Sequence, residues 1–179
     1  MITTVFGGPD SGKSAVAEKL LSEFDGNKYY LATMRVITDE DKARVEKHRA
    51  NRESYGFVTI EQDVAIVKAI DKIKWMDSLL GGGDGPKSVL IECLPRLCAN
   101  EMFLDSGETV PHKDVESTVL CGIALLKEYF ENIIIVSDKD AKMADYRCRA
   151  SDDADEANEY SEAMTELNAA LEKLSDKIC

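Results

Sequence analysis

Residues 7–14 form an uninterrupted Gly-x-x-x-x-Gly-Lys-Ser motif, which is typical of a phosphate-binding loop. A short β-prone run precedes the motif at residues 1–6, and a run of helix-forming residues follows it at 15–21. In this setting the glycines let backbone N–H groups converge on phosphate oxygens, and the helix N-terminus adds positive potential. The predicted nucleotide-binding residues of the loop are Gly7, Gly8, Pro9, Asp10, Ser11, Gly12, Lys13 and Ser14. The motif predicts a fold that binds a nucleoside triphosphate, or one descended from such a fold.

The loop also predicts where a metal ion would bind. Lys13 would reach the β- and γ-phosphates of the nucleotide, and the Ser14 hydroxyl would ligate Mg²⁺. Phosphate loops usually work with an acid at the end of a buried strand, and Glu92 closes the apolar run Val89-Leu90-Ile91. The alternative for Glu92 is an ordinary strand-end carboxylate that faces solvent. We therefore expect Ser14 and Glu92 to form the metal site.

β-prone runs alternate with helical patterns along the whole chain. The predicted strands are residues 3–6, 28–33, 57–60, 88–93 and 132–137, and the predicted helices after the loop are 39–52, 64–80, 114–130 and 158–178. The strands at 88–93 and 132–137 are continuously apolar, as in a parallel sheet covered on both faces. The pattern predicts a single α/β domain over residues 1–179, with a mostly parallel sheet of about six strands between helix layers. Loops are expected at 81–86 and 104–113.

Charge and composition exclude several classes of protein. The chain of 179 residues has 34 acidic and 22 basic residues and a formal net charge of −12, which disfavours general nucleic-acid binding. No apolar run approaches the length of a membrane span and no export signal is evident, so we expect a cytoplasmic protein. Residues 151–179 contain nine of the acids, which we interpret as a solvated helical face rather than a docking site.

The cysteines and one of the two histidines carry no evident chemistry. The five cysteines include no Cys-x-x-Cys pair, so they indicate neither a zinc site nor a redox dithiol, and we expect mostly buried free thiols. His112 lies in a loop next to a proline with no constellation of partner residues, and we expect it to be a surface residue.

The other histidine, His48, lies in a helix rich in cations. At helical spacing it shares one face with Arg44 and Arg52, and Lys47 and Arg49 flank it. Nearby cations would lower the pKa of the imidazole and keep it neutral and nucleophilic, and they would also gather phosphate oxygens around it. From spacing alone, an exposed helix histidine among solvated charges is the simpler interpretation.

Several motifs together resemble the bifunctional adenosylcobinamide kinase / adenosylcobinamide-phosphate guanylyltransferase family of cobalamin biosynthesis. They keep their order and spacing from residue 1 to about residue 103. The matching segments are the loop at 7–14, Tyr30-Leu31-Ala32-Thr33, the acidic run 39–41 with the Arg-x-x-x-His-Arg-x-x-Arg helix at 44–52, the strand with Phe57, Thr59 and Glu61, Leu90-Ile91-Glu92-Cys93-Leu94, and Asn100. An ordinary phosphate-loop kinase lacks that histidine helix, so the combination is specific.

The resemblance implies a two-step chemistry. A nucleoside triphosphate (GTP or ATP) first phosphorylates adenosylcobinamide, and GMP then passes from GTP to the new phosphate through a covalent adduct on His48. Mg²⁺ is the implied metal, held by Ser14 and Glu92. Arg49, Arg52 and Glu61 join the nucleotide-binding residues, with the two arginines as phosphate clamps. A RecA-like parallel sheet and a homo-oligomer, a trimer in the family, are implied as well.

The last third of the chain departs from the family pattern. The valine–proline segment expected after the fifth strand is missing, and Ala169 replaces a glutamine. A further departure lies in the phosphate loop, where Asp10 replaces a basic residue. Two alternatives to the two-step enzyme therefore stay open. One is a phosphate-loop kinase or nucleotidyltransferase of the same fold with another substrate, and the other is a nucleotide-binding regulator without catalysis.

Overall fold

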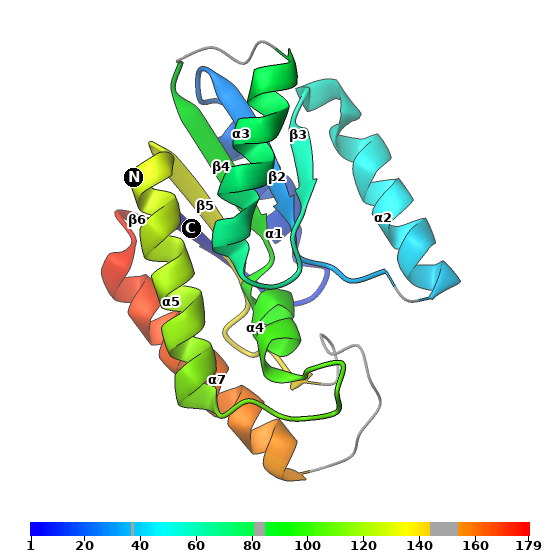
Figure 1. Ribbon diagram of the computed structural model, residues 1–179, viewed down its shortest axis with the longest axis vertical. Helices are drawn as coiled ribbons and strands as arrows, with labels where there is room; N and C mark the ends of the chain where they lie inside the picture. The colour runs from blue at the N-terminus through cyan, green and yellow to red at the C-terminus, as the bar shows by residue number, and fades with distance from the viewer. Residues whose placement is uncertain (37, 81–84, 144–153) are drawn as a thin grey trace.

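One six-stranded sheet organises the protein, in the strand order β3-β2-β4-β5-β1-β6 with every pairing parallel (Figure 1). The computed structural model describes residues 1–36, 38–80, 85–143 and 154–179, without the side chains of residues 40, 44, 47, 48, 51 and 80. The strands are β1 (Ile2–Phe6), β2 (Asn27–Ala32), β3 (Val58–Glu61), β4 (Lys87–Glu92), β5 (Asn132–Ser137) and β6 (Lys177–Ile178). The helices are α1 (Lys13–Ser22), α2 (Asp39–Arg52), α3 (Ala69–Leu80), α4 (Leu94–Met102), α5 (His112–Tyr129) and α7 (Ala154–Leu174), with 3₁₀ turns η1 (Glu53–Tyr55) and η2 (Ile66–Lys68).

Helices cover both faces of the sheet, which gives the predicted three-layer α/β architecture. On one face, α3, α4, α5 and α7 pack over the larger apolar core, and Figure 1 shows this layer in front of the strands. On the other face, Ala17 and Leu21 of α1 pack against Leu90 and Ile134. Because the central strands β4 and β5 are covered on both sides, they are apolar without alternation, as their sequences predicted.

The strand order brings the ends of distant segments to one edge of the sheet. Strand β5 lies between β1, which leads into the phosphate loop, and β4, which ends in Glu92. Ala32 of β2 is in register with both Glu61 of β3 and Glu92 of β4. Since all strands are parallel, their carboxyl ends meet beside the loop, which is where ligands bind in open α/β sheets.

The five predicted strands and the predicted helix at 39–52 are confirmed, but the bounds of the other predicted helices differ. Helix α5 begins at His112, inside the predicted loop 104–113, and α7 begins at Ala154. The predicted helix 64–80 begins at Ala69, because Ala65 has a left-handed backbone (φ 47°) and its N–H binds Glu101 Oε1 at 2.5 Å. The predicted helix 158–178 ends at Leu174, because the chain beyond it pairs with β1: the Cys179 N–H donates to the Thr4 carbonyl at 2.9 Å. This pairing forms β6, the sixth strand.

Helix α4 was not predicted at all. Its sequence begins Leu94-Pro95 directly after a buried strand, so it looks like the end of that strand or a turn. Proline is tolerated in the first turn of a helix because its missing N–H would have no partner there.

Residues 81–84 of the predicted loop 81–86 lie outside the described residues. In the described part of the chain, no helix has the length and apolar character needed to cross a membrane.

Helix α7 is hydrogen-bonded to the end of β5 through the buried side chain of Asn168. Its Oδ1 accepts a hydrogen bond from Ser137 Oγ at 2.6 Å, and its Nδ2 donates to the Asp138 carbonyl at 3.0 Å. The Ser137 carbonyl in turn accepts from the Gly7 N–H at 3.2 Å. Asn168 therefore connects the last helix to the start of the phosphate loop.

We expect Asn168→Ala to lower the free energy of unfolding by about 2–3 kcal/mol, because two buried polar groups lose their partner. Chemical denaturation monitored by circular dichroism measures this change. Asn158→Ala, at an exposed position of the same helix, is the matched control and should stay within about 0.5 kcal/mol of the parent. Equal stability of the two variants would contradict the role of Asn168.

Candidate nucleotide-binding site

The phosphate loop joins β1 to α1 in the predicted order. Gly12 precedes the helix with a left-handed backbone (φ 82°), a conformation that glycine adopts without strain. Asp10 is also left-handed (φ 53°) and its side chain is exposed, so the carboxylate that departs from the family pattern is turned toward solvent. Lys13 Nζ donates to the Gly8 carbonyl at 2.8 Å, which holds the ammonium group over the loop.

The predicted metal-site residues, Ser14 and Glu92, are in contact. Ser14 Oγ, in the first turn of α1, donates a hydrogen bond to Glu92 Oε1 at 2.9 Å. Glu92 Oε2 is buried and has no hydrogen-bond partner among the described residues. A hydroxyl beside a carboxylate with an unused oxygen is a donor set that suits Mg²⁺, which prefers hard oxygen ligands. These residues therefore fit the metal that the loop implies.

Glu92 lies in an environment that disfavours its charged form. Burial raises its pKa to about 7, although the hydrogen bond from Ser14 and the charge of Lys13 oppose the rise. Such a carboxylate destabilises the empty site at neutral pH and gains most when a cation comes close. The alternative of a solvent-facing strand-end carboxylate does not describe this residue.

The backbone beyond Glu92 is held by Thr33, a buried residue at the end of the neighbouring strand. Thr33 Oγ1 donates to the Glu92 carbonyl at 2.9 Å and accepts from the Cys93 N–H at 2.8 Å. Asn100 Nδ2 donates to the carbonyls of Thr33 and Asp63, at 2.7 and 3.0 Å. Thr33 and Asn100 thus fix the backbone that positions the Glu92 carboxylate.

Helix α2 is attached to the sheet through its last turn. The guanidinium of Arg52 lies 3.9 Å from the centre of the Tyr30 ring, and its Nη2 donates to Thr59 Oγ1 at 3.4 Å. Arg49 pairs with Glu61 at the end of β3. Arg52 is 5% exposed, so in this structure it packs under the helix, while Arg49 and Glu61 are exposed. The predicted phosphate contacts of these three residues stay predictions.

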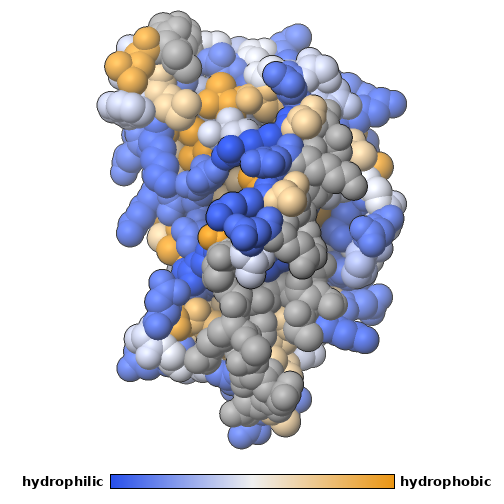
Figure 2. Space-filling view, turned by 90° about the vertical axis from the view of Figure 1, so that its right-hand side faces the viewer, coloured by the Kyte–Doolittle hydropathy of each residue, from blue (hydrophilic) through white to orange (hydrophobic). Residues whose placement is uncertain are grey.

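The helix backbone places His48 one turn before Arg52, but the side chains of Arg44, Lys47 and His48 lie outside the described part of the structure. Figure 1 shows α2 running alongside the edge strand β3, and in Figure 2 the coloured atoms on this side of the molecule are mostly hydrophilic. A cavity of about 140 Å³ separates the helix from the sheet. Its lining residues are Tyr30, Ala32, Met34, Val45, Arg52, Glu92, Cys93 and Arg96.

Sequence reasoning missed Glu18, a buried acid on the inner face of α1. Burial raises its pKa, and the charge of Arg52 opposes the rise. Glu18 lies four residues after Ser14, on the same face of the helix, and this spacing could have identified it. Arg52 is therefore close to Glu18 as well as to the Tyr30 ring. The negative charge of Glu18 offsets the positive charge of Arg52, which is one of the cations expected around His48.

Comparisons with known proteins show what this sequence is similar to. The sequence matches the family described as "Cobinamide kinase / cobinamide phosphate guanyltransferase" (CobU) over residues 3–179. It is similar to the bifunctional adenosylcobalamin biosynthesis proteins CobU of Escherichia coli (30% identity over 62% of this chain and 55% of that one) and Salmonella typhimurium (27% over 63% and 56%). The match thus spans little more than half the length of these relatives.

Among solved structures, the chain is similar to one described as an ATPase domain. The TM-score is 0.48 at 15% identity, and the similarity covers 91% of this chain and 66% of the other.

The raised pKa of Glu92 makes stability depend on pH. Protonated Glu92 favours the folded state, and this contribution to the free energy of unfolding is complete below pH 4.5 and is lost as the pH rises through about 7. The difference between the two limits is about 3 kcal/mol. Without nucleotide and with EDTA, Glu92→Gln should therefore gain about 2–3 kcal/mol over the parent between pH 4.5 and pH 8. Urea denaturation across this range measures it. Glu131→Gln, at an exposed acid, is the control, and a parallel pH profile for both variants would refute the environment described for Glu92.

The stacked position of Arg52 predicts that the planar shape of its side chain matters. Arg52→Lys keeps the charge but loses the flat contact with Tyr30, and should lower the free energy of unfolding by about 1–2 kcal/mol. Arg49→Lys, in an exposed ion pair, should change it by less than about 0.5 kcal/mol. Thermal and urea unfolding compare the two, and an equal response would show that Arg52 does not anchor α2.

Proposed function

Because the chain belongs to the cobinamide kinase / cobinamide phosphate guanyltransferase family, we propose that it phosphorylates adenosylcobinamide and then transfers GMP from GTP to the product. The contact between Ser14 and Glu92 at the mouth of the phosphate loop carries this proposal. It supplies the metal-binding half of a phosphoryl-transfer site, next to the helix that bears the histidine. The proposal names GTP as the source of GMP and either GTP or ATP as the phosphate donor.

In the proposed mechanism, the backbone N–H groups of the loop bind the triphosphate and Lys13 moves from the Gly8 carbonyl to the β- and γ-phosphates. Mg²⁺, held by Ser14 and Glu92, would neutralise charge on the phosphate oxygens when bound. Positioning of the acceptor hydroxyl in line with the γ-phosphorus then accounts for the kinase step, since this chemistry needs mainly orientation and charge stabilisation.

For the second step, a neutral His48 imidazole attacks the α-phosphorus of GTP. An N–P bond forms, the bond to the bridging oxygen breaks, pyrophosphate leaves, and the imidazole loses its ring proton. The cobinamide phosphate oxygen then displaces the imidazole and takes the GMP. The contact of Arg52 with the Tyr30 ring supports this, because it attaches the helix that bears His48 to the sheet. Val45 of the same helix lines a cavity together with Glu92.

Further parts of the proposal rest on the family. We place the reaction in the cytoplasm, in one nucleotide-binding domain over residues 1–179 that assembles as a homo-oligomer, with the trimer of the family as its expected form. Arg49 and Arg52 act as phosphate clamps. The Arg49–Glu61 pair opens when nucleotide binds, whereas Arg52 stays on the Tyr30 ring and meets a phosphate oxygen in the cavity that it lines. The cobinamide acceptor follows from the family, whereas the cavity under α2 has room for part of a phosphate group near Arg52.

The decisive experiment is intact-protein mass spectrometry after incubation with GTP and Mg²⁺. We expect one GMP adduct per chain, stable in base and labile in acid, as a phosphoramidate is. His48→Ala should abolish the adduct, whereas His112→Ala, which removes the other histidine, should keep it. Lys13→Ala should slow its formation by about 100-fold or more, because a charge-stabilising group at the phosphates is lost.

The other outcomes identify the alternative functions. Triphosphate turnover that survives His48→Ala but not Lys13→Ala would indicate a phosphate-loop enzyme with another substrate. Nucleotide binding without turnover or adduct would indicate a regulatory protein in which His48 has no catalytic role. Either result would overturn the two-step transferase.

A further inference from the structure

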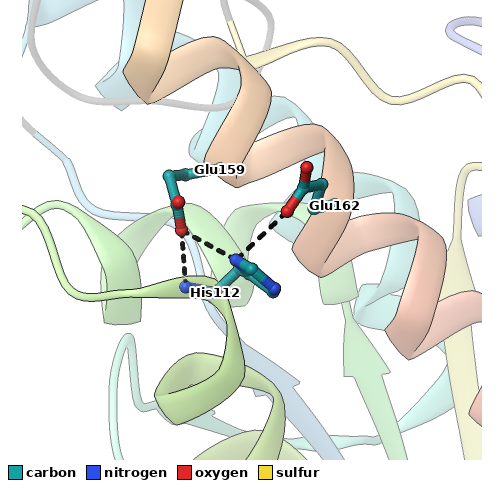
Figure 3. A group of neighbouring side chains, drawn as sticks. All are labelled: His112, Glu159 and Glu162. Atoms are coloured by element: carbon teal, nitrogen blue, oxygen red, sulfur yellow. Dashed lines mark hydrogen bonds and ion pairs between the residues drawn. The ribbon is translucent and has the colours of Figure 1, made fainter.

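A second group of chemically active side chains lies where the start of α5 meets α7, outside the nucleotide site (Figure 3). His112 is the first residue of α5, and Glu159 and Glu162 are one turn apart on α7. His112 Nδ1 lies 2.9 Å from Glu159 Oε2 and 3.3 Å from Glu162 Oε2, and the His112 N–H donates to Glu159 Oε2 at 2.8 Å. The expectation of a surface histidine without partners was wrong.

Acidic side chains outnumber basic ones around His112. Two more acids, Glu116 and Glu166, lie close by, and Lys113 pairs with both. Glu166 Oε2 is buried without a hydrogen-bond partner among the described residues, 4.0 Å from His112 Nε2. The four carboxylates and the Lys113 ammonium group carry an excess of negative charge, which a divalent cation would compensate.

The geometry resembles that of a metal site before the ion binds. One ligand atom each from His112, Glu159 and Glu162 lies within 4.8 Å of the other two. Tetrahedral zinc with bonds of about 2.0–2.2 Å keeps its ligand atoms about 3.3–3.6 Å apart. The distance from His112 Nδ1 to Glu162 Oε2 is 3.3 Å, and the one to Glu159 Oε2, at 2.9 Å, would have to lengthen slightly. An imidazole with two carboxylates suits zinc and its neighbours in the transition series better than Mg²⁺ or Ca²⁺.

We propose that His112, Glu159 and Glu162 bind one divalent transition metal ion of the zinc class, which connects the N-terminus of α5 to α7. The fourth ligand position stays open to water, since three protein ligands leave one position of a tetrahedron free. The ion would stabilise the position of α7, and α7 carries the Asn168 that holds the end of β5 next to the phosphate loop. This site is separate from the Mg²⁺ site of the proposed transferase and does not depend on that function.

The test is metal binding by the full-length protein after chelator treatment. Zn²⁺ titration against a chromophoric chelator should give one equivalent per chain and raise the melting temperature. Co²⁺ should give the absorption bands of nitrogen and oxygen ligands without thiolate charge transfer. This spectrum matters because Cys121 and Cys179 are exposed free thiols, contrary to the expectation of mostly buried cysteines.

The variants separate this site from other ligands. His112→Ala and Glu162→Gln should each weaken Zn²⁺ binding by at least about tenfold, since even outer-shell partners of a metal are often worth that much. Glu162 is exposed, so its variant tests the site without disturbing the contact of His112 with Glu159. Glu172→Gln, on the same helix but paired with Lys139, is the matched control. The proposal would be overturned if the protein does not bind one equivalent of Zn²⁺, or if both site variants bind Zn²⁺ as well as the parent does. A Co²⁺ spectrum with thiolate charge-transfer bands would overturn it as well.

Discussion

The hydrogen bond between Ser14 and Glu92 is the contact on which the site depends. It forms because a parallel sheet directs the phosphate loop after β1 and the acid at the end of β4 to the same edge, with β5 between them. Burial makes the Glu92 carboxylate unfavourable when it is charged, and its second oxygen has no partner among the described residues. A fold that maximised its own stability would not keep such a group. Its presence is understandable as preparation for a cation and a polyanion that arrive together.

Helix α2 shows how a polar element is held in place with little apolar burial. At its start, the Thr38 side chain accepts from the Asp41 N–H at 3.1 Å, and Asp41 Oδ2 accepts from the Thr38 N–H at 3.0 Å. At its end, Arg52 stacks on Tyr30 and Arg49 pairs with Glu61. The capping box stabilises the free end, and the arginines attach the other end to the sheet.

The acidic last third of the chain contributes more than a solvated surface. Tyr160 donates to the Pro95 carbonyl at 3.1 Å, and Asn168 holds Ser137. Acids that looked uniformly solvent-directed in the sequence divide into a face that meets α5 at His112 and a face that meets water. Although this part departs most from the family pattern, it adds β6 to the sheet and contacts the end of β5 through Asn168.

Much of the fold could be predicted from local patterns, because strand and helix periodicity and loop motifs depend on residues close in sequence. Residues 7–14, the five strands, the boundaries of α2 and the choice of Glu92 as the acid belong to this class. Helix α4, the late start of α3 and the strand β6 could not be predicted, since they follow from a tolerated proline, a left-handed alanine and pairing with the first strand. The same distinction holds for the candidate sites: a local motif predicted Ser14 and the family resemblance predicted His48. The burial of Arg52 under α2 and the contact of His112 with Glu159 instead join segments that are farther apart in the chain. Local motifs thus indicate the phosphate-binding loop and its acid, because these depend on residues close in sequence. The contact of His112 with Glu159 is visible only in the folded chain, because the packing of α5 on α7 brings the two residues together.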